Sequence, residues 1–335
     1  MQVTLKPLEQ QTLVITGASS GIGLATARHA VSLGARVVIV SRSPAALEAI
    51  AREIDPGGRQ VLAAAADVGR SDEVERVAQA AIERFGGFDT WVNNAGVGIW
   101  GRLTEVPEDE HRRLFETNFW GMVNGSLVAA RHLRGRGGAI VNVGSITGDR
   151  AWPLQGMYCA SKHAIKGFTE TLRVELEQEC AGISITLIKP AAIGTPLLQH
   201  AANFTGRRLR LPPPIYAPEE AAHAICHAAQ HPVRDVYVGG SGLLASTVGL
   251  HAPRVTDWIS EAALFEAQLG PQAVPPTQGN LHRPMAGGRE RGDDFGRPLQ
   301  SSFYTRVTLH PSAWNPVRGL GDLAASLMPA SRRRY

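Results

Sequence analysis

The sequence predicts an α/β fold, a doubly wound parallel sheet of about seven strands with helices on both faces. Over the first 240 residues, short β-branched runs alternate with longer amphipathic stretches, which is the rhythm of parallel strands connected by helices. A glycine-rich turn also joins the first strand to the first helix. The expected strands are 12–16, 36–41, 60–65, 90–93, 139–143, 184–188 and 235–238.

The regular pattern divides the chain into two parts. Residues 71–85 form an expected helix, with Ser71 as its N-cap. Because the rhythm fades near residue 250, we expect a main domain at 1–250 and a C-terminal extension at 251–335, with one helix at 255–269. Four aromatic residues favour docking of the extension on the main domain or on a neighbouring subunit: Trp258, Phe265, Phe303 and Trp314.

Composition is that of an ordinary soluble protein, with 335 residues, 44% of them hydrophobic and 19% charged. The net charge is only +4, and the basic residues are spread out apart from Arg207–Arg210 and Arg332–Arg334, so no nucleic-acid-binding stripe is expected. Cys159, Cys180 and Cys226 show no paired spacing, so neither a disulfide framework nor a zinc site is indicated. Since the sequence shows no signal peptide and no long apolar run, we expect a cytoplasmic protein without a membrane span.

The glycine-rich turn TGASSGIG, at 16–23, stands between a strand and a helix. Gly17, Gly21 and Gly23 allow the main chain to approach a pyrophosphate, and the following helix points its unpaired N–H groups at the anion. Such a turn alone often only packs a helix on a sheet. Because both the strand and the helix are present, we interpret it as a nucleotide phosphate loop.

The pentapeptide YCASK places Tyr158 four residues before Lys162, so both share one face of a helix. An ammonium group there would lower the pKa of the phenol from its usual value of about 10 and make it a better general acid. An exposed pair on a surface helix would give the same pattern. From these five residues alone, both interpretations stay open.

A series of motifs between about residues 8 and 240 together resembles the short-chain dehydrogenase/reductase family. The phosphate turn has that family's GxxxGxG spacing, and it is followed in order by Asp67-Val68, NNAG at 93–96, Asn118 in TNFWG, Ser145 in VNVGSITG, and Tyr158 with Lys162. The resemblance implies a Rossmann-like fold and hydride transfer between a nicotinamide cofactor and a carbonyl compound or its alcohol.

The resemblance also implies catalytic roles. Tyr158 would give its proton to the substrate oxygen, and Ser145 would hydrogen-bond that oxygen as the hydride arrives. Lys162 would lower the tyrosine pKa and hold the nicotinamide ribose. Asn118 would keep a water molecule in place that connects Lys162 to solvent.

The end of the second strand bears on the choice of cofactor. An acid there usually binds the ribose of NAD, whereas an arginine accommodates the 2′-phosphate of NADP. The sequence reads Val40-Ser41-Arg42-Ser43, without an acid. We therefore expect NADP(H) to be preferred and NAD(H) to be possible, although Arg42 could also be a solvated residue at the strand end.

The remaining cofactor contacts are implied by the resemblance. Asp67 would contact the adenine, and Asn94 and Gly96 would form a wall beside the ribose, while Asn94 could also be a purely structural bridge. The whole expected set is Gly17, Ser19, Ser20, Gly21, Ile22, Gly23, Ser41, Arg42, Asp67, Val68, Asn94, Ala95, Gly96, Tyr158, Lys162, Pro190, Ile193 and Thr195.

The chain departs from the family pattern after the sixth strand, where Pro190-Ala191 stands in place of the usual Pro-Gly. Alanine does not readily reach positive φ, so we expect a turn of different shape. Thr195 still stands where a hydroxyl would meet the nicotinamide carboxamide, and Ile193 where a backbone amide could.

The segment 196–218 would cover the substrate. Its candidate lining residues are Leu197, Leu198 and Phe204, while its arginines at 207, 208 and 210 are expected to face solvent. Trp100 and Trp152 follow the fourth and fifth strands, at the edge where open sheets bind ligands. Either could be core packing, but if both line the pocket the substrate is bulky and apolar.

Two other functions stay open. A sugar-nucleotide epimerase or dehydratase would share the nucleotide fold, but the GxxxGxG spacing and the lack of a second substrate domain speak against it. A non-catalytic NADP(H)-binding sensor or scaffold would be expected to have lost Tyr158 or Lys162, and both are present.

The expected partners are a small carbonyl or alcohol substrate and further copies of the chain. By the family's habit, the helix with Tyr158 and Lys162 and the helix with Asn118 would form a homodimer or homotetramer. We expect the extension to be accessory, because every cofactor motif lies before residue 200 and His282, Asp293 and Asp294 are scattered in loop-like sequence. It would cap the substrate cleft or brace a subunit interface.

Overall fold

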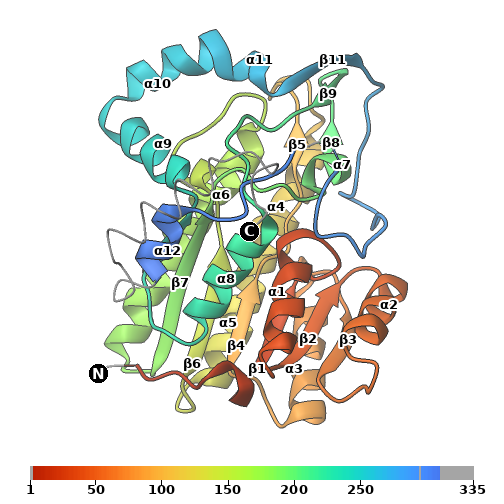
Figure 1. Cartoon of the computed structure of the whole chain (residues 1–335), viewed down its shortest axis with the longest axis vertical. Helices are drawn as coiled ribbons and strands as arrows, with labels where there is room; N and C mark the ends of the chain where they lie inside the picture. Colours follow the sequence, from red (N-terminus) through yellow and green to blue (C-terminus); the bar gives the residue numbers. More distant parts are fainter. Residues whose placement is uncertain (1–2, 294–295, 310–335) are drawn as a thin grey trace, which may run out of the picture.

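The computed structural model describes residues 3–293 and 296–309. Its centre is a seven-stranded sheet in the order β10-β7-β6-β4-β1-β2-β3 (Figure 1). Every strand pairs in parallel with its neighbours, so all carboxyl ends meet at one edge. The chain order reverses between β1 and β4, which confirms the predicted doubly wound sheet. The strands are β1 (Thr12–Thr16), β2 (Arg36–Ser41), β3 (Val61–Ala65), β4 (Thr90–Asn93), β6 (Gly138–Val143), β7 (Ile183–Pro190) and β10 (Asp235–Val238).

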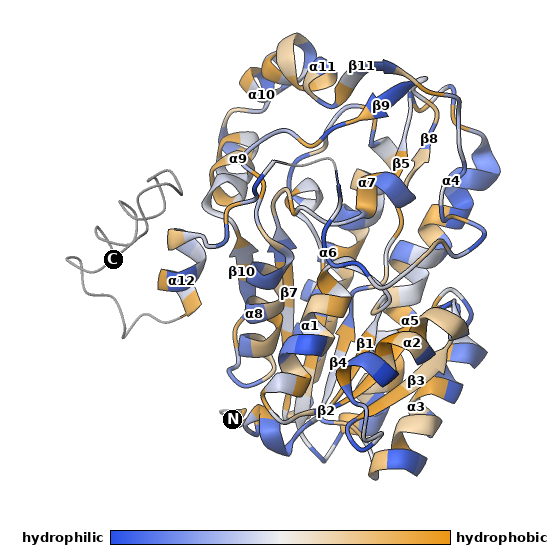
Figure 2. Ribbon diagram, turned by 45° about the vertical axis from the view of Figure 1, so that its right-hand side comes forward, coloured by the Kyte–Doolittle hydropathy of each residue, from blue (hydrophilic) through white to orange (hydrophobic). Residues whose placement is uncertain are grey.

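Alternation along the strands divides the core into two layers. Leu13 and Ile15 of β1 belong to one buried cluster, and Val14 between them belongs to the other, because successive side chains of a strand point to opposite faces. Figure 2 shows the apolar strands enclosed between helices. The first layer is covered by α1 (Gly21–Ser32), α2 (Pro44–Ile54) and α8 (Pro218–Ala228), and the second by α3 (Ser71–Phe85), α5 (Gly121–Leu133) and α6 (Gly156–Gln178).

The helix predicted at 71–85 is α3, but its N-cap is Arg70 and the prediction of Ser71 is wrong. Arg70 has an extended backbone, and Ser71 is the first helical residue. The carboxylate of Glu73 accepts a hydrogen bond from the N–H of Asp67 (2.7 Å). An acid in the first helical turn, and not a serine hydroxyl, therefore links α3 to the chain that precedes it.

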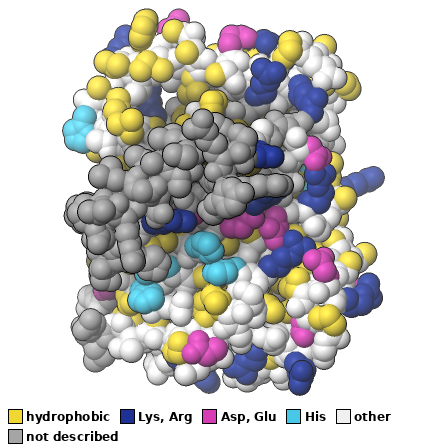
Figure 3. Space-filling model, in the orientation of Figure 1, with side chains coloured by type: hydrophobic (Ala, Val, Ile, Leu, Met, Phe, Trp, Pro, Cys, Tyr) yellow, Lys and Arg dark blue, Asp and Glu magenta, His cyan; other side chains and the backbone are white. Residues whose placement is uncertain are grey.

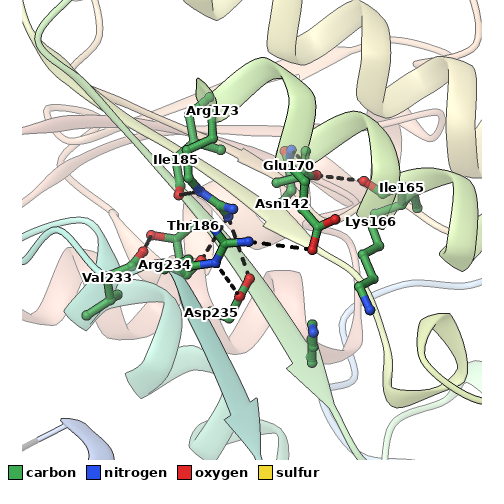
Figure 4. A network of polar contacts seen from close by, with 12 residues as sticks. Asn142, Ile165, Lys166, Glu170, Arg173, Ile185, Thr186, Val233, Arg234 and Asp235 are labelled. Atoms are coloured by element: carbon green, nitrogen blue, oxygen red, sulfur yellow. Dashed lines mark hydrogen bonds and ion pairs between the residues drawn. The ribbon is translucent and has the colours of Figure 1, made fainter. Parts of the chain in front are cut away.

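α6 is fixed to the sheet by a buried arginine. Arg173 is only 4% exposed, and it donates to the carbonyl groups of Ile185 on β7 and of Arg234 before β10 (3.0 Å each). Arg234 in turn lies 3.7 Å from Glu170 on α6 (Figure 4). These contacts set the position of α6 along β7. They hold the amino-terminal end of the helix at the carboxyl edge of the sheet.

The described part of the extension returns across that edge (Figure 1). α9 (Gly240–His251), α10 (Pro253–Ile259), the π-helical turn η4 (Ser260–Leu264) and α11 (Phe265–Ala267) follow one another. The helix predicted at 255–269 is thus interrupted by a π turn, and Leu269 already belongs to β11 (Leu269–Ala273). This strand pairs antiparallel with β9 (Arg207–Leu209). Trp314, Asp294 and the arginine run at 332–334 lie outside the described residues.

The remaining elements are η1 (Leu8–Gln10), β5 (Ile99–Trp100), α4 (Glu108–Phe115), the π-helical turn η2 (Glu116–Trp120), η3 (Ile146–Gly148), α7 (Leu197–His200), β8 (Ala202–Asn203) and α12 (Phe303–Leu309). Within 3–293 and 296–309, none of the helices has the length and apolar character that crossing a bilayer requires. On the face drawn in Figure 3, acidic and basic side chains are interspersed.

Candidate active site

A cleft opens at the carboxyl edge of the sheet, where β1 and β4 lie side by side at the reversal of chain order. The ends of β1, β2, β4, β6 and β7 border it, together with the first turns of α1 and α6. Ligands of open α/β sheets bind at this place. All residues of the predicted catalytic and cofactor sets line the cleft except Gly23 and Asn118.

The turn from β1 to α1 leaves no room for side chains. Gly17 has φ +67°, and a Cβ atom there would lie 2.7 Å from Cα of Ala95. A Cβ at Gly23 would lie 2.3 Å from the carbonyl oxygen of Gly17, so Gly23 packs behind the turn. Gly21 and Ile22 border the cleft with the first turn of α1, whose N–H groups lack partners within the helix. This shape fits a pyrophosphate.

Asn94 joins β4 to the same turn. Its side-chain Nδ2 donates to the carbonyl of Thr16 (2.9 Å) and to that of Gly17 (3.3 Å), and its own N–H donates to the Thr16 hydroxyl (2.9 Å). The structural bridge that the sequence left open is therefore present. Asn94 also lines the cleft, so the two interpretations do not exclude each other.

Tyr158, Lys162 and Ser145 come together within the cleft. The Nζ atom of Lys162 lies 5.6 Å from the centre of the Tyr158 ring and donates to the carbonyl of Val143 at the end of β6 (3.0 Å). Ser145 is close enough to Tyr158 to favour its ionised form and so lower its pKa, and the Oγ of Ser145 accepts from the N–H of Thr147 (3.1 Å). The end of β6 and the start of α6 thus place all three polar groups together.

Burial governs the protonation of this pair. It lowers the pKa of Lys162 to about 8, and it raises the pKa of Tyr158 well above the usual value. The nearby Ser145 hydroxyl lowers the pKa of Tyr158, but by less than burial raises it. The lowered tyrosine pKa that the sequence predicted is not found here, because desolvation disfavours the phenolate and the neighbouring Cys159 adds to this effect. At neutral pH Tyr158 keeps its proton.

A buried ion cluster supports the loop that carries Ser145. Asp149 accepts hydrogen bonds from Lys166 of α6 (2.7 Å) and from the hydroxyl of Tyr237 on β10 (2.8 Å), and it lies 3.3 Å from Nζ of Lys189 on β7. Burial opposes ionisation of Asp149, but its cationic and hydroxyl partners outweigh burial and lower its pKa. The cluster ties the residues after Ser145 to α6, β7 and β10.

Asn118 lies in the π-helical turn η2, a type of turn that is frequent at functional sites. Its Oδ1 accepts from the N–H of Val97 (2.8 Å), and its Nδ2 donates to the carbonyl of Val97 (3.0 Å) and to Ser161 (3.3 Å). In this structure Asn118 therefore positions the wall that follows β4. Its contact with a water molecule that connects Lys162 to solvent stays a prediction.

Arg42 and Asp67, which follow β2 and β3, are both held by contacts within the protein. Arg42 donates to the carbonyl of Leu281 (2.7 Å) and to that of Asn280, so it is not a solvated strand-end residue. Burial lowers its pKa, with a further contribution from Arg113. The carboxylate of Asp67 accepts from the N–H of Gly69 (3.0 Å) and from Arg113 (2.5 Å).

In the turn after β7, the φ angle of Ala191 is not positive, as expected of alanine. Apart from glycine, only Leu154 and Cys180 have positive φ among the described residues, so Ala191 does not. Its N–H donates to the carbonyl of Val238 (2.9 Å), which continues the pairing with β10. Thr195 follows the turn, is 8% exposed and lines the cleft.

Trp100, Trp152 and Leu197 all line the cleft. The ring of Trp100 lies nearly parallel to that of Tyr158, at an interplanar angle of 25° and a centroid distance of 6.5 Å. Leu198 and Phe204, which were predicted to line the pocket, pack into neighbouring hydrophobic clusters instead. The wall beside the tyrosine is therefore largely aromatic and aliphatic.

The extension contacts this wall directly. Gln268 is fully buried, and its Oε1 accepts from Gln155 (2.5 Å) and from the indole of Trp100 (3.2 Å). Arg207 forms an ion pair with Glu266 (2.8 Å) and donates to the carbonyl of Gly270 (2.9 Å), so it faces the extension and not solvent as predicted.

Sequence reasoning missed several cleft residues: Gln155, His200, Leu211, Asn280, Pro284 and Met285. The last three belong to the extension, so the groups of this cleft do not all lie before residue 200 as expected. Their segment is rich in glycine and proline and has no periodicity, so no pattern marks it. Gln155 stands three residues before Tyr158, and that spacing could have suggested it.

Comparisons with known proteins agree with this geometry. The family model described as short chain dehydrogenase matches residues 11–205. The "Uncharacterized oxidoreductase YxnA" of Bacillus subtilis (strain 168) is 41% identical over 314 residues, which are 92% of this chain and 88% of that protein. The "11-beta-hydroxysteroid dehydrogenase A" of Sesamum indicum is 34% identical over 260 residues, 74% of each protein.

Two solved structures have the same fold. One is a short-chain dehydrogenase/reductase from Burkholderia phymatum in complex with NAD, with a TM-score of 0.66 and 25% identity over 76% of this chain and 96% of that one. The other is an alcohol dehydrogenase from Thermococcus sibiricus complexed with 5-hydroxy-NADP, with a TM-score of 0.59 and 28% identity over 68% of this chain and 95% of that one. With the seven-stranded sheet and the family model in agreement, the chain belongs to the short-chain dehydrogenase/reductase family of oxidoreductases.

Proposed function

We propose that the protein is an NADP(H)-dependent oxidoreductase that interconverts a carbonyl compound and its alcohol. The observation that carries this proposal is that Tyr158, Ser145 and Lys162 share one cleft with the glycine turn that fits a pyrophosphate. A nicotinamide cofactor, when bound, supplies or accepts the hydride. Proton transfer and orientation of the substrate are then the tasks of this chain's side chains.

Tyr158 is the general acid in the direction of reduction. Burial keeps its proton in place at neutral pH, and Ser145 is placed to hydrogen-bond the substrate oxygen as negative charge develops on it. The ammonium of Lys162 lies close enough to stabilise the phenolate that proton donation leaves behind. In the direction of oxidation the same phenolate accepts the alcohol proton.

The preference for NADP(H) rests on the end of β2. Ser41 and Arg42 line the cleft there, and β2 carries no acid that would repel a 2′-phosphate. A guanidinium has five N–H donors, so the two carbonyl contacts of Arg42 leave donors for a phosphate. NAD(H) stays possible, and the structural neighbours were solved with NAD in one case and with 5-hydroxy-NADP in the other.

The substrate is bulky and apolar in this proposal, because Trp100, Trp152 and Leu197 line the cleft. Buried aromatic side chains favour large apolar ligands. The Sesamum indicum relative is named for a hydroxysteroid, a substrate class of that kind.

The proton-donating role of Tyr158 is tested with a panel of bulky ketones and alcohols, assayed with NADPH and NADP. We expect turnover by the wild-type protein and a loss of about a hundred- to ten-thousand-fold in Tyr158→Phe, with NADPH affinity unchanged because only the hydroxyl is removed. A variant within a few-fold of wild type would remove Tyr158 from the mechanism. A wild-type protein that binds NADPH and turns over nothing in the panel would favour a sensor.

The pKa of Lys162 predicts a pH profile. The group is charged below its pKa of about 8 and loses its charge above it. Since kcat/KM reports ionisations of the free enzyme, kcat/KM for reduction should be level near neutrality and fall as pH rises through about 8. Lys162→Met should be slow at every pH and lack this fall. A wild-type profile that stays level far above that pH would contradict the assignment.

The cofactor preference is tested at Arg42. Arg42→Asp removes a charge-assisted hydrogen bond to a 2′-phosphate and adds repulsion, so the ratio of NADPH to NADH affinity should fall by about ten- to a hundred-fold. The ratio is the useful quantity, because a general disturbance of the site would weaken both cofactors alike. Isothermal titration of both cofactors measures it, and an unchanged ratio would refute the preference.

We also infer assembly into a homodimer or homotetramer through α5 and α6. Trp120, Leu127 and Val174 on or beside these helices are 49%, 42% and 60% exposed, and exposed large apolar side chains can mark an interface. Light scattering at micromolar concentration should give a mass that is a multiple of 35.8 kDa. The double variant Leu127→Glu with Val174→Glu should have a lower mass. A wild-type mass equal to one chain would contradict the inference.

A further inference from the structure

The segment from Gln278 to Asp293, here called the strap, crosses the nucleotide half of the cleft. It begins beside Arg42, at the end of β2, and reaches the glycine turn that follows β1. Between these two places Pro284 and Met285 line the cleft. The strap therefore forms an outer wall over residues that would hold the adenosine and the phosphates.

The first attachment of the strap is buried. Leu281 is fully buried in a hydrophobic cluster with Val97 and Leu114, and its carbonyl accepts from both Arg42 (2.7 Å) and Arg113 (3.0 Å).

A buried acid holds the chain on both sides of Leu281. Glu110 is 2% exposed, and it binds Gln278 (2.6 Å) and His282 (2.7 Å). Opening the strap here would uncover an apolar side chain and leave a buried carboxylate without partners.

The second attachment is made at the surface, mostly by main-chain groups. The N–H of Gly288 donates to the carbonyl of Ser19 (2.8 Å), and the N–H of Gly21 donates to the carbonyl of Arg289 (2.9 Å). Arg28 pairs with Glu290 (2.6 Å). Gly288 is exposed, with φ +87° and no atom within 4 Å of the position of a Cβ. None of the residues that make these contacts has a large apolar side chain.

Asn280 provides an independent sign that a ligand belongs beneath the strap. Asn280 lines the cleft, and its Oδ1 atom is buried without a hydrogen-bond partner among the described residues. A buried acceptor without a donor is costly, and it is usually satisfied by a ligand or by water. The neighbouring main chain of Asn280 binds Arg42, which places this acceptor near the site of the adenosine ribose.

We propose that the strap is part of the cofactor site: Asn280 accepts a hydrogen bond from the adenosine portion, and the second attachment opens and closes to let the dinucleotide exchange. The first attachment stays closed and acts as the fixed end. This inference rests on the proposed function, since it takes the dinucleotide as the ligand of the cleft. It makes cofactor exchange, rather than chemistry, the step that the extension controls.

A reversible disulfide tests the opening. A Cβ at Gly287 would lie 3.1 Å from Cβ of Ala46 and 2.8 Å from the carbonyl oxygen of Ser19, so a small outward shift brings the pair near the ~3.5–4.5 Å Cβ separation of disulfides. The variant is Ala46→Cys with Gly287→Cys, in a Cys180→Ser background because Cys180 is the exposed native cysteine. Each single cysteine variant serves as a control for the oxidant.

The measured quantity is the rate at which bound NADPH, followed by its fluorescence, is displaced by excess NADP. In protein loaded and then oxidised, dissociation should be at least about tenfold slower than in the same protein after reduction, and the single variants should not respond. Equal rates in the oxidised and reduced double variant, with the disulfide confirmed by mass, would overturn the proposal.

A second variant tests the same step without a disulfide. Gly288→Pro removes the N–H that binds Ser19 and cannot adopt the observed φ, so NADPH dissociation should become about tenfold faster. Gly58→Pro is the matched control. Gly58 is also exposed, has φ +64° with no atom within 4 Å of its Cβ position, and donates its N–H to a main-chain carbonyl (3.0 Å), but it lies outside the cleft. If both variants change the NADPH dissociation rate equally, or if neither changes it, the proposed opening of the strap is contradicted.

Asn280→Leu tests the acceptor. Loss of one hydrogen bond should weaken NADPH binding by roughly two- to tenfold, with little change in thermal stability because Oδ1 has no protein partner to lose. Unchanged affinity would remove Asn280 from the site. If neither NADPH nor NADH binds the wild-type protein, the proposed function itself fails. If the cofactor binds tightly but its dissociation rate does not respond to the strap variants, only this inference is refuted.

Discussion

The close approach of the first βα turn to β4 is the constraint on which the site depends. Gly17 and Gly23 leave no space for side chains at this contact, and the amide of Asn94 spans from β4 to the carbonyl groups of the turn. The start of α1 is therefore fixed at the carboxyl edge of the sheet. Because the seven strands of the central sheet are parallel, Ser145 after β6 and Tyr158 at the start of α6 reach the same edge.

Burial then decides which chemistry this edge supports. Tyr158 and Lys162 lie in a desolvated environment that keeps the phenol protonated and makes the ammonium easy to deprotonate. The buried polar groups behind the site need hydrogen-bond partners. Asp149 and Arg173 provide them and so connect α6, β7 and β10. The protein thus places a proton donor beside a lysine whose charge is sensitive to pH near 8.

Much of this could be predicted from local rules. The strands followed from β-branched runs and the phosphate turn from glycine spacing between a strand and a helix. The four-residue spacing of Tyr158 and Lys162 gave their shared helix face, while their catalytic role came from the family resemblance. The pKa of Tyr158 could not be predicted, because it depends on burial by distant segments. Nor could Asn280, which reaches the cleft from sequence without periodicity and contacts Arg42. The contact of Gln268 with Trp100 could not be predicted either, because it joins residues far apart in the sequence. The predicted N-cap of α3 was wrong by one residue: Arg70 keeps an extended backbone, and Ser71 already belongs to the helix.

The central claim is that the cleft binds a nicotinamide dinucleotide from the glycine turn to the tyrosine. A crystal structure of the protein with NADP tests it most directly. The account predicts the pyrophosphate at Ile22 in the first turn of α1, the nicotinamide ribose at Lys162 with the ring beside Tyr158, and the adenosine between Arg42 and Asn280 beneath the strap. A dinucleotide bound outside this cleft, or with its nicotinamide end away from Tyr158, would contradict the account.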